Sequence, residues 1–80
     1  MPSANIAYSN LRAEMARKGI TILEISKKLG VERDTAGRKL SGKSQLYLRE
    51  ALTITKMFFS DNVEAKMKYL FSEIYNQKAG

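Results

Sequence analysis

Two short helical patterns, each followed by a glycine, lie next to each other at residues 21–42, and this stretch most constrains the fold. Thr21 and Glu24 begin the first pattern and match a capping box, in which each side chain bonds to the backbone amide of the other residue. Gly30 ends that pattern, most simply in the left-handed conformation that glycine adopts at little cost. We therefore expect two short helices joined by a tight turn, with the second helix at about residues 32–40.

Apolar residues recur at helical spacing in both patterns and mark the sides that face a core. Ile22, Ile25 and Leu29 repeat at intervals of three and four in the first helix. Ala36 and Leu40 lie four apart in the second helix. Each helix is therefore expected to have one buried side and one side that is open to a partner.

Three further helices are predicted, at residues 6–18, from residue 44 or 45 to 58, and at 62–75. Ser60 or Asp61 is expected to cap the last of them. No strand-like alternation competes with these patterns, so we expect an all-α fold: one domain over residues 1–80, with an ordered core at about 6–75. The apolar residues expected to face the core from these helices are Leu11, Met15, Leu48, Ala51, Ile54, Phe58, Val63, Met67, Leu70, Phe71 and Ile74.

The composition excludes several classes of function. The chain has no cysteine and no histidine, so it lacks thiolate and imidazole metal ligands and the most common general base. It also has no convergent carboxylate cluster, and we expect neither an enzyme nor a cofactor nor a small-molecule ligand. No apolar run approaches the length of a membrane span, and no signal peptide is apparent, so a cytoplasmic location is expected.

The charge of the chain is informative because it is concentrated. The formal net charge is +6 for 80 residues. Residues 27–49 hold seven Lys and Arg residues against two Asp and Glu residues, and thus carry five of the six net positive charges. Such a cluster favours a polyanionic partner, although a basic surface that is merely solvated would look the same.

The central stretch resembles the helix-turn-helix of the Cro and phage-repressor class, which is the lambda repressor-like DNA-binding domain. The residues that carry this resemblance are Thr21, Ile25, Ser26, Leu29, Gly30, Val31, Thr35, Leu40 and Gly42. The resemblance implies a compact five-helix fold in which the second and third helices form the motif. The segments YSNLRAEMARKGIT and KMKYLFSEI also look like those of small phage-encoded regulators from Gram-positive hosts.

Three positions depart from the pattern of that class. Ile22 stands where the class usually has a glutamine that bonds to a phosphate, and Ile22 cannot make this bond. Ala36 replaces a valine or isoleucine, and Gly37 replaces a serine or a similar small polar residue. Gly37 could permit close approach of the backbone to DNA, or it could be a weakly optimised position.

The resemblance also implies which residues would meet DNA. The third helix would present its exposed side to base edges, and neighbouring groups would bind phosphates. Asp34 could accept from a cytosine or only orient Arg38, and the two could also be a plain surface pair; Thr35 could contact a phosphate or only pack. The residues expected at bases are Arg33, Asp34, Gly37 and Arg38, and those expected at phosphates are Thr21, Thr35, Lys39, Lys43 and Ser44, with the amides that begin the fourth helix.

The expected function is that of a sequence-specific regulator that binds double-stranded DNA, a Cro-like phage or prophage repressor. Its partner would be an operator, and two copies would form a weak homodimer on a palindromic site. Tyr69 or Tyr75, with part of the last apolar stripe, could supply the contact between copies. The alternative from another class is a protein-interaction module of the same fold, an antitoxin-like or anti-repressor partner.

Overall fold

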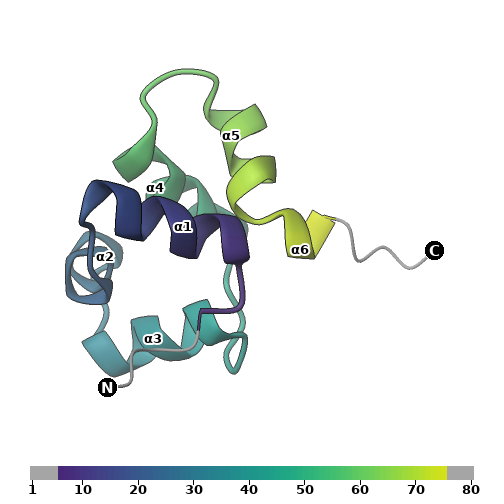
Figure 1. The fold of residues 1–80 in the computed structure, drawn as a ribbon. Helices are drawn as coiled ribbons and strands as arrows, with labels where there is room; N and C mark the ends of the chain where they lie inside the picture. The colour runs from purple at the N-terminus through teal and green to yellow at the C-terminus, as the bar shows by residue number, and fades with distance from the viewer. Residues whose placement is uncertain (1–5, 76–80) are drawn as a thin grey trace.

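The computed structural model describes residues 6–75, which fold into a compact bundle of short helices (Figure 1). Within this part of the chain there is no strand, so the expected all-α class is confirmed. No helix there is long and apolar enough to cross a membrane. The expectations for residues 1–5 and 76–80 lie outside the described residues. The helices are α1 (Ser9–Lys18), α2 (Ile22–Leu29), α3 (Arg33–Ser41), α4 (Leu48–Phe58), α5 (Val63–Leu70) and α6 (Ser72–Tyr75).

The chain before α1 is extended rather than helical, so the expected start of the first helix at residue 6 is wrong. Ile6 and Tyr8 are both buried, and the Ala7 amide donates to the Leu40 carbonyl over 2.8 Å. This bond ties Ala7 to the end of α3, and the extended backbone of Tyr8, with φ −95° and ψ 102°, leads from there into α1. The N-terminal segment thereby helps to hold α3 in place.

The helix α4 begins at Leu48, three or four residues later than expected. Its first turn is capped by Glu50, whose Oε1 accepts a hydrogen bond of 2.9 Å from the Tyr47 amide. Leu48 is 69% exposed, so its expected place in the core is wrong. The later apolar residues of this helix, Ala51 and Ile54 among them, are buried as expected.

The expected single helix at residues 62–75 is broken into α5 and α6. The break is at Phe71, whose backbone has φ −115° and ψ 38°. Phe71 thereby packs into the core, with its ring 5.0 Å from that of Tyr8 in an edge-to-face contact. Ile74 is left 45% exposed instead of buried. Asn62, rather than Ser60 or Asp61, is the residue that precedes α5.

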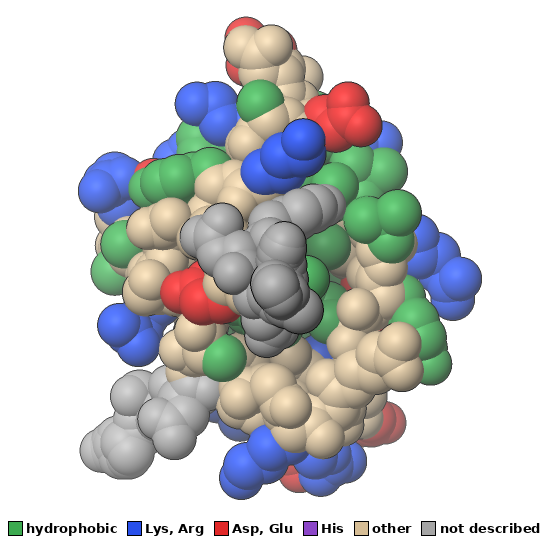
Figure 2. Space-filling view, turned by 90° about the vertical axis from the view of Figure 1, so that its right-hand side faces the viewer, with side chains coloured by type: hydrophobic (Ala, Val, Ile, Leu, Met, Phe, Trp, Pro, Cys, Tyr) green, Lys and Arg blue, Asp and Glu red, His purple; other side chains and the backbone are tan. Residues whose placement is uncertain are grey.

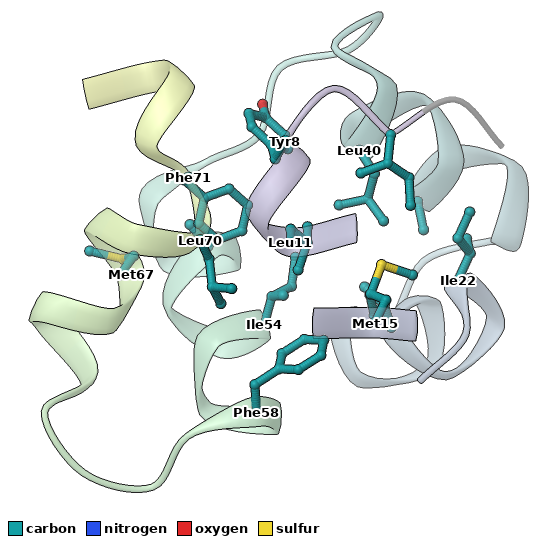
Figure 3. Close-up of a cluster of buried hydrophobic side chains, with 14 residues drawn as sticks. Tyr8, Leu11, Met15, Ile22, Leu40, Ile54, Phe58, Met67, Leu70 and Phe71 are labelled. Atoms are coloured by element: carbon teal, nitrogen blue, oxygen red, sulfur yellow. The ribbon is translucent and has the colours of Figure 1, made fainter. Parts of the chain in front are cut away.

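The core is one cluster of side chains from α1 to α5, together with Ile6 and Tyr8 before α1 and Phe71 after α5 (Figure 3). Leu11, Ile54 and Leu70 are fully buried at its centre, where α1, α4 and α5 meet. Ile25 and Leu40 are equally buried and connect α2 and α3 to the same cluster. Each such side chain contributes about 1.5–3 kcal/mol relative to exposure, so the position of α3 is fixed by the main core.

Candidate nucleic-acid interface

The helix α2 is fixed at its start by the predicted capping box. The Thr21 hydroxyl accepts a 3.2 Å hydrogen bond from the Glu24 amide, and the Glu24 carboxylate accepts a 2.8 Å bond from the Thr21 amide. Thr21 is exposed, but its hydroxyl is thus engaged within the chain. Ile22 is buried in the core.

The turn between α2 and α3 is built on Gly30, as predicted. Its φ of 74° and ψ of 32° lie in the left-handed region, where a side chain would be strained. Val31 follows with its amide 3.0 Å from the Ser26 carbonyl, and its half-buried side chain packs against the core. The chain therefore leaves α2 and enters α3 through one fixed turn.

The helix α3 separates a buried side from an exposed side, as the spacing predicts. Ala36 and Leu40 have no exposed surface, whereas Arg33, Asp34 and Arg38 are exposed. Among the described residues, these three exposed side chains form neither an ion pair nor a side-chain hydrogen bond. The orientation of Arg38 by Asp34 and a plain Asp34–Arg38 surface pair therefore both lack a contact to support them.

Gly37 is half-buried on the same helix and has open space around it. A Cβ atom added there would meet no heavy atom within 4 Å, apart from the helix's own backbone and the adjoining residues. Packing inside the protein therefore does not require glycine. This geometry is compatible with both interpretations from the sequence: close approach of the backbone to DNA, and a weakly optimised position.

Some of the residues expected at phosphates are exposed, and others have groups that already form hydrogen bonds within the protein. Lys43 is exposed, and Thr35 and Ser44 are half-buried. The amides of Lys43 and Ser44 both donate to the Arg38 carbonyl, over 2.9 and 3.1 Å, and close the end of α3. Because α4 begins only at Leu48, these amides lie before its first turn, and the expected phosphate contacts of the amides that begin the fourth helix stay a prediction.

Lys39 differs most from its expected place, because its side chain points inward. Its Nζ lies 3.1 Å from Oε1 of Glu50 and donates to the Gln45 carbonyl over 3.1 Å. It also lies 4.9 Å from the centre of the Tyr47 ring. Lys39 as a whole is 8% exposed, so this ammonium is already bound within the protein.

The structure draws attention to Leu23, Lys27 and Arg49, which were not among the residues expected to contact DNA. A shallow groove lies between α2 and the start of α3, and the half-exposed Leu23 lines it together with Lys27 and Arg33. Arg49 is exposed at the start of α4, with its guanidinium 5.9 Å from the Tyr47 ring. The clustering of charge in residues 27–49 was the signal that could have pointed to Arg49.

Basic side chains lie at the end of the molecule formed by α3, which is the lower end in Figures 1 and 2, and also along its flanks. Acidic side chains accompany them at that end. Within the described residues, no group of His, Cys, Asp and Glu side chains could hold a metal ion. Comparisons with protein-family models, with curated proteins and with solved structures found no match.

Proposed function

We propose that this protein is a sequence-specific regulator that binds double-stranded DNA, with a lambda repressor-like fold of the Cro and phage-repressor kind. In this proposal α2 and α3 form the helix-turn-helix, and α3 is the recognition helix that enters the major groove. One observation carries it: α3 is held by the fully buried Ala36 and Leu40, while Arg33, Asp34 and Arg38 are exposed and unpaired within the described chain.

The chemistry of the exposed side suits base edges in the major groove. A guanidinium can donate two hydrogen bonds to O6 and N7 of a guanine, and such a pair contributes about 1–3 kcal/mol of discrimination. Arg33 and Arg38 are five positions apart on α3, so they would contact different base pairs. Asp34 would accept from a cytosine amino group, and Gly37 would let the backbone approach the bases closely.

Phosphates of the DNA backbone would be bound by residues next to the exposed side of α3. Lys43 and Ser44 follow α3 directly, and Thr35 lies on α3 beside the groove that Arg33 also lines. Thr21 is left out because Glu24 already binds its amide and its hydroxyl. Lys39 is left out of this set because its ammonium is bound by Glu50 and Gln45.

Two copies would bind a palindromic operator as a weak dimer. Tyr69 is 39% exposed and Ile74 is 45% exposed, at the end of the molecule formed by α5 and α6. Apolar groups of this kind could form the contact between copies, whereas the side chain of Tyr75 lies outside the described part. The half-sites would then be about one helical turn apart.

Selection of binding sites from random duplex DNA, followed by sequencing, tests the proposal. The expected result is one enriched motif, with two half-sites related by symmetry. Recovery of random sequences without any enriched motif at moderate salt would refute the regulator and favour a protein-interaction module. The same experiment reports the half-site spacing and thus tests the dimer separately.

A further inference from the structure

Lys39 and Glu50 form a largely buried ion pair that joins α3 to the start of α4 across the loop at residues 43–47. We propose that Lys39 is a positioning residue for DNA binding: it holds this loop against α3, so that Lys43 and Ser44 meet phosphates while α3 lies in the groove. This role rests on the proposed function. It also reverses the expectation from the sequence, in which Lys39 itself contacts a phosphate.

Three parts of the loop and of α4 converge on the Lys39 ammonium. It lies 3.1 Å from Glu50 Oε1, donates to the Gln45 carbonyl over 3.1 Å, and lies 4.9 Å from the centre of the Tyr47 ring. Glu50 Oε1 also accepts the Tyr47 amide over 2.9 Å. The side chains of Lys39 and Glu50 are only 10% and 12% exposed, so the ammonium would have to leave all three partners to reach DNA.

A second set of bonds ties the beginning of the loop to α3. The Arg38 carbonyl accepts from the amides of Lys43 and Ser44. Arg38 and Lys39 are adjacent, and their side chains point to opposite environments, since Arg38 is exposed and Lys39 is buried. The recognition helix therefore holds the loop at its beginning through the backbone and at its end through Lys39.

The nature of the pair favours a role in positioning. A buried ion pair is often no more stabilising than apolar side chains of the same volume. Its hydrogen bonds, however, fix direction as well as distance, and the bond from Lys39 to the Gln45 carbonyl holds the middle of the loop, between the backbone bonds of Lys43 and Ser44 and the capping bond of Tyr47. Leu46 packs against the core, whereas Lys43, Gln45 and Tyr47 are exposed. Groups that are fixed before binding lose less conformational entropy when they meet a ligand.

The variant Glu50→Gln separates positioning from direct contact by the sign of its effect. It keeps the size of the side chain and an oxygen for the Tyr47 amide, but it removes the charge that holds Lys39. If Lys39 contacts a phosphate directly, its release and the added net positive charge tighten binding. If Lys39 positions the loop, binding of the selected duplex weakens, by about tenfold. Glu64→Gln, at an exposed glutamate of α5, is the matched control for charge.

A double-mutant cycle identifies the group through which Lys39 acts. Lys39→Met and Lys43→Ala are measured singly and together, at several salt concentrations, on the selected duplex. With a positioning role, Lys43→Ala weakens binding in the wild type but has little further effect in the Lys39→Met background. Two independent phosphate contacts would instead give additive losses, each lowering the salt dependence by about one unit of slope.

Folding is checked for each variant by circular dichroism and thermal unfolding. If Lys39→Met leaves Glu50 unpaired and fails to fold, the double variant Lys39→Met/Glu50→Gln, which buries no charge, replaces it in the cycle. Tighter binding by Glu50→Gln, or additivity in the cycle, would overturn the positioning role and leave the proposed function intact. A wild-type protein without any sequence preference would overturn both.

Discussion

Glu73 caps the first helix from 64 positions further along the chain: its Oε2 accepts hydrogen bonds from the amide and the hydroxyl of Ser9, each over 2.9 Å. The residue that precedes α1, Tyr8, has a side chain that forms no capping bond. The two ends of the described chain are thus joined by one carboxylate.

This cap predicts how stability depends on pH. The hydrogen bonds from Ser9 lower the pKa of Glu73 from its ordinary value of 4.5, although partial burial opposes them. The Glu73 carboxylate therefore takes up a proton less readily in the folded protein than in the unfolded chain. The stabilisation is present above about pH 4.5 and is lost as the pH falls through the lowered pKa.

The measurement is the thermal unfolding midpoint between pH 7 and pH 3, for the wild type and for Glu73→Gln. The midpoint of the wild type should fall more steeply below pH 4.5 than that of the variant, because glutamine does not titrate. The other carboxylates titrate in both proteins, so the difference between the two curves isolates Glu73. Parallel curves would show that this cap contributes nothing to the acid response.

A second prediction compares one substitution at two leucines. Leu40 has no exposed surface, whereas Leu48 is 69% exposed. Leu40→Ala leaves a cavity in the core and should lower the free energy of unfolding by about 2–5 kcal/mol. Leu48→Ala should change it by no more than about 0.5 kcal/mol. Chemical denaturation measures both, and a large loss at Leu48 would contradict the exposed position given by the structure.

A third prediction concerns Gly37. Alanine there meets no neighbouring atom and has the higher helix propensity, so Gly37→Ala should raise the free energy of unfolding by about 1 kcal/mol. If the backbone at this position approaches the bases, the same methyl group should weaken binding to the selected duplex. Increased stability together with reduced affinity is the expected outcome. Increased stability with unchanged affinity would identify Gly37 as a weakly optimised position.

A fourth prediction separates the two arginines from general positive charge. Arg33→Ala and Arg38→Ala should each relax the preference at one base pair, by about 1–3 kcal/mol, and retain weak binding to any duplex. Lys68→Ala removes the same charge from α5, a helix that lies away from α3 (Figure 1), and should preserve the preference. Competition binding against single-base variants of the duplex measures this. An unchanged preference in both arginine variants would show that α3 is not the helix that reads bases.

The helices α2 and α3 could be predicted from the sequence because the signals that define them are local. The capping box of Thr21 and Glu24 and the turn at Gly30 involve residues within one helical turn of each other, and the structure has both. Ala36 and Leu40 are likewise four apart, so the buried side of α3 followed from periodicity alone. The exposed positions of Arg33, Asp34 and Arg38 followed from the same periodicity.

The features that the sequence did not predict depend on distant partners. Lys39 is bound by Glu50, eleven positions away and beyond a loop, and its charge alone suggested an exposed residue. The break at Phe71 places its ring against Tyr8, near the other end of the chain. Leu48 has the spacing of a core residue relative to Ala51 and Ile54. Because α4 begins only at Leu48, however, this side chain lies at the exposed start of the helix.

The most direct test of the proposed function is a titration of the wild-type protein with two duplexes of equal length at about physiological salt. One carries the motif obtained by selection, and the other carries the same bases in shuffled order. We expect the selected duplex to bind at least about 10³-fold more tightly. We also expect both affinities to fall as salt rises, because phosphate contacts contribute to each. Equal affinity for the two duplexes would contradict sequence-specific recognition by α3.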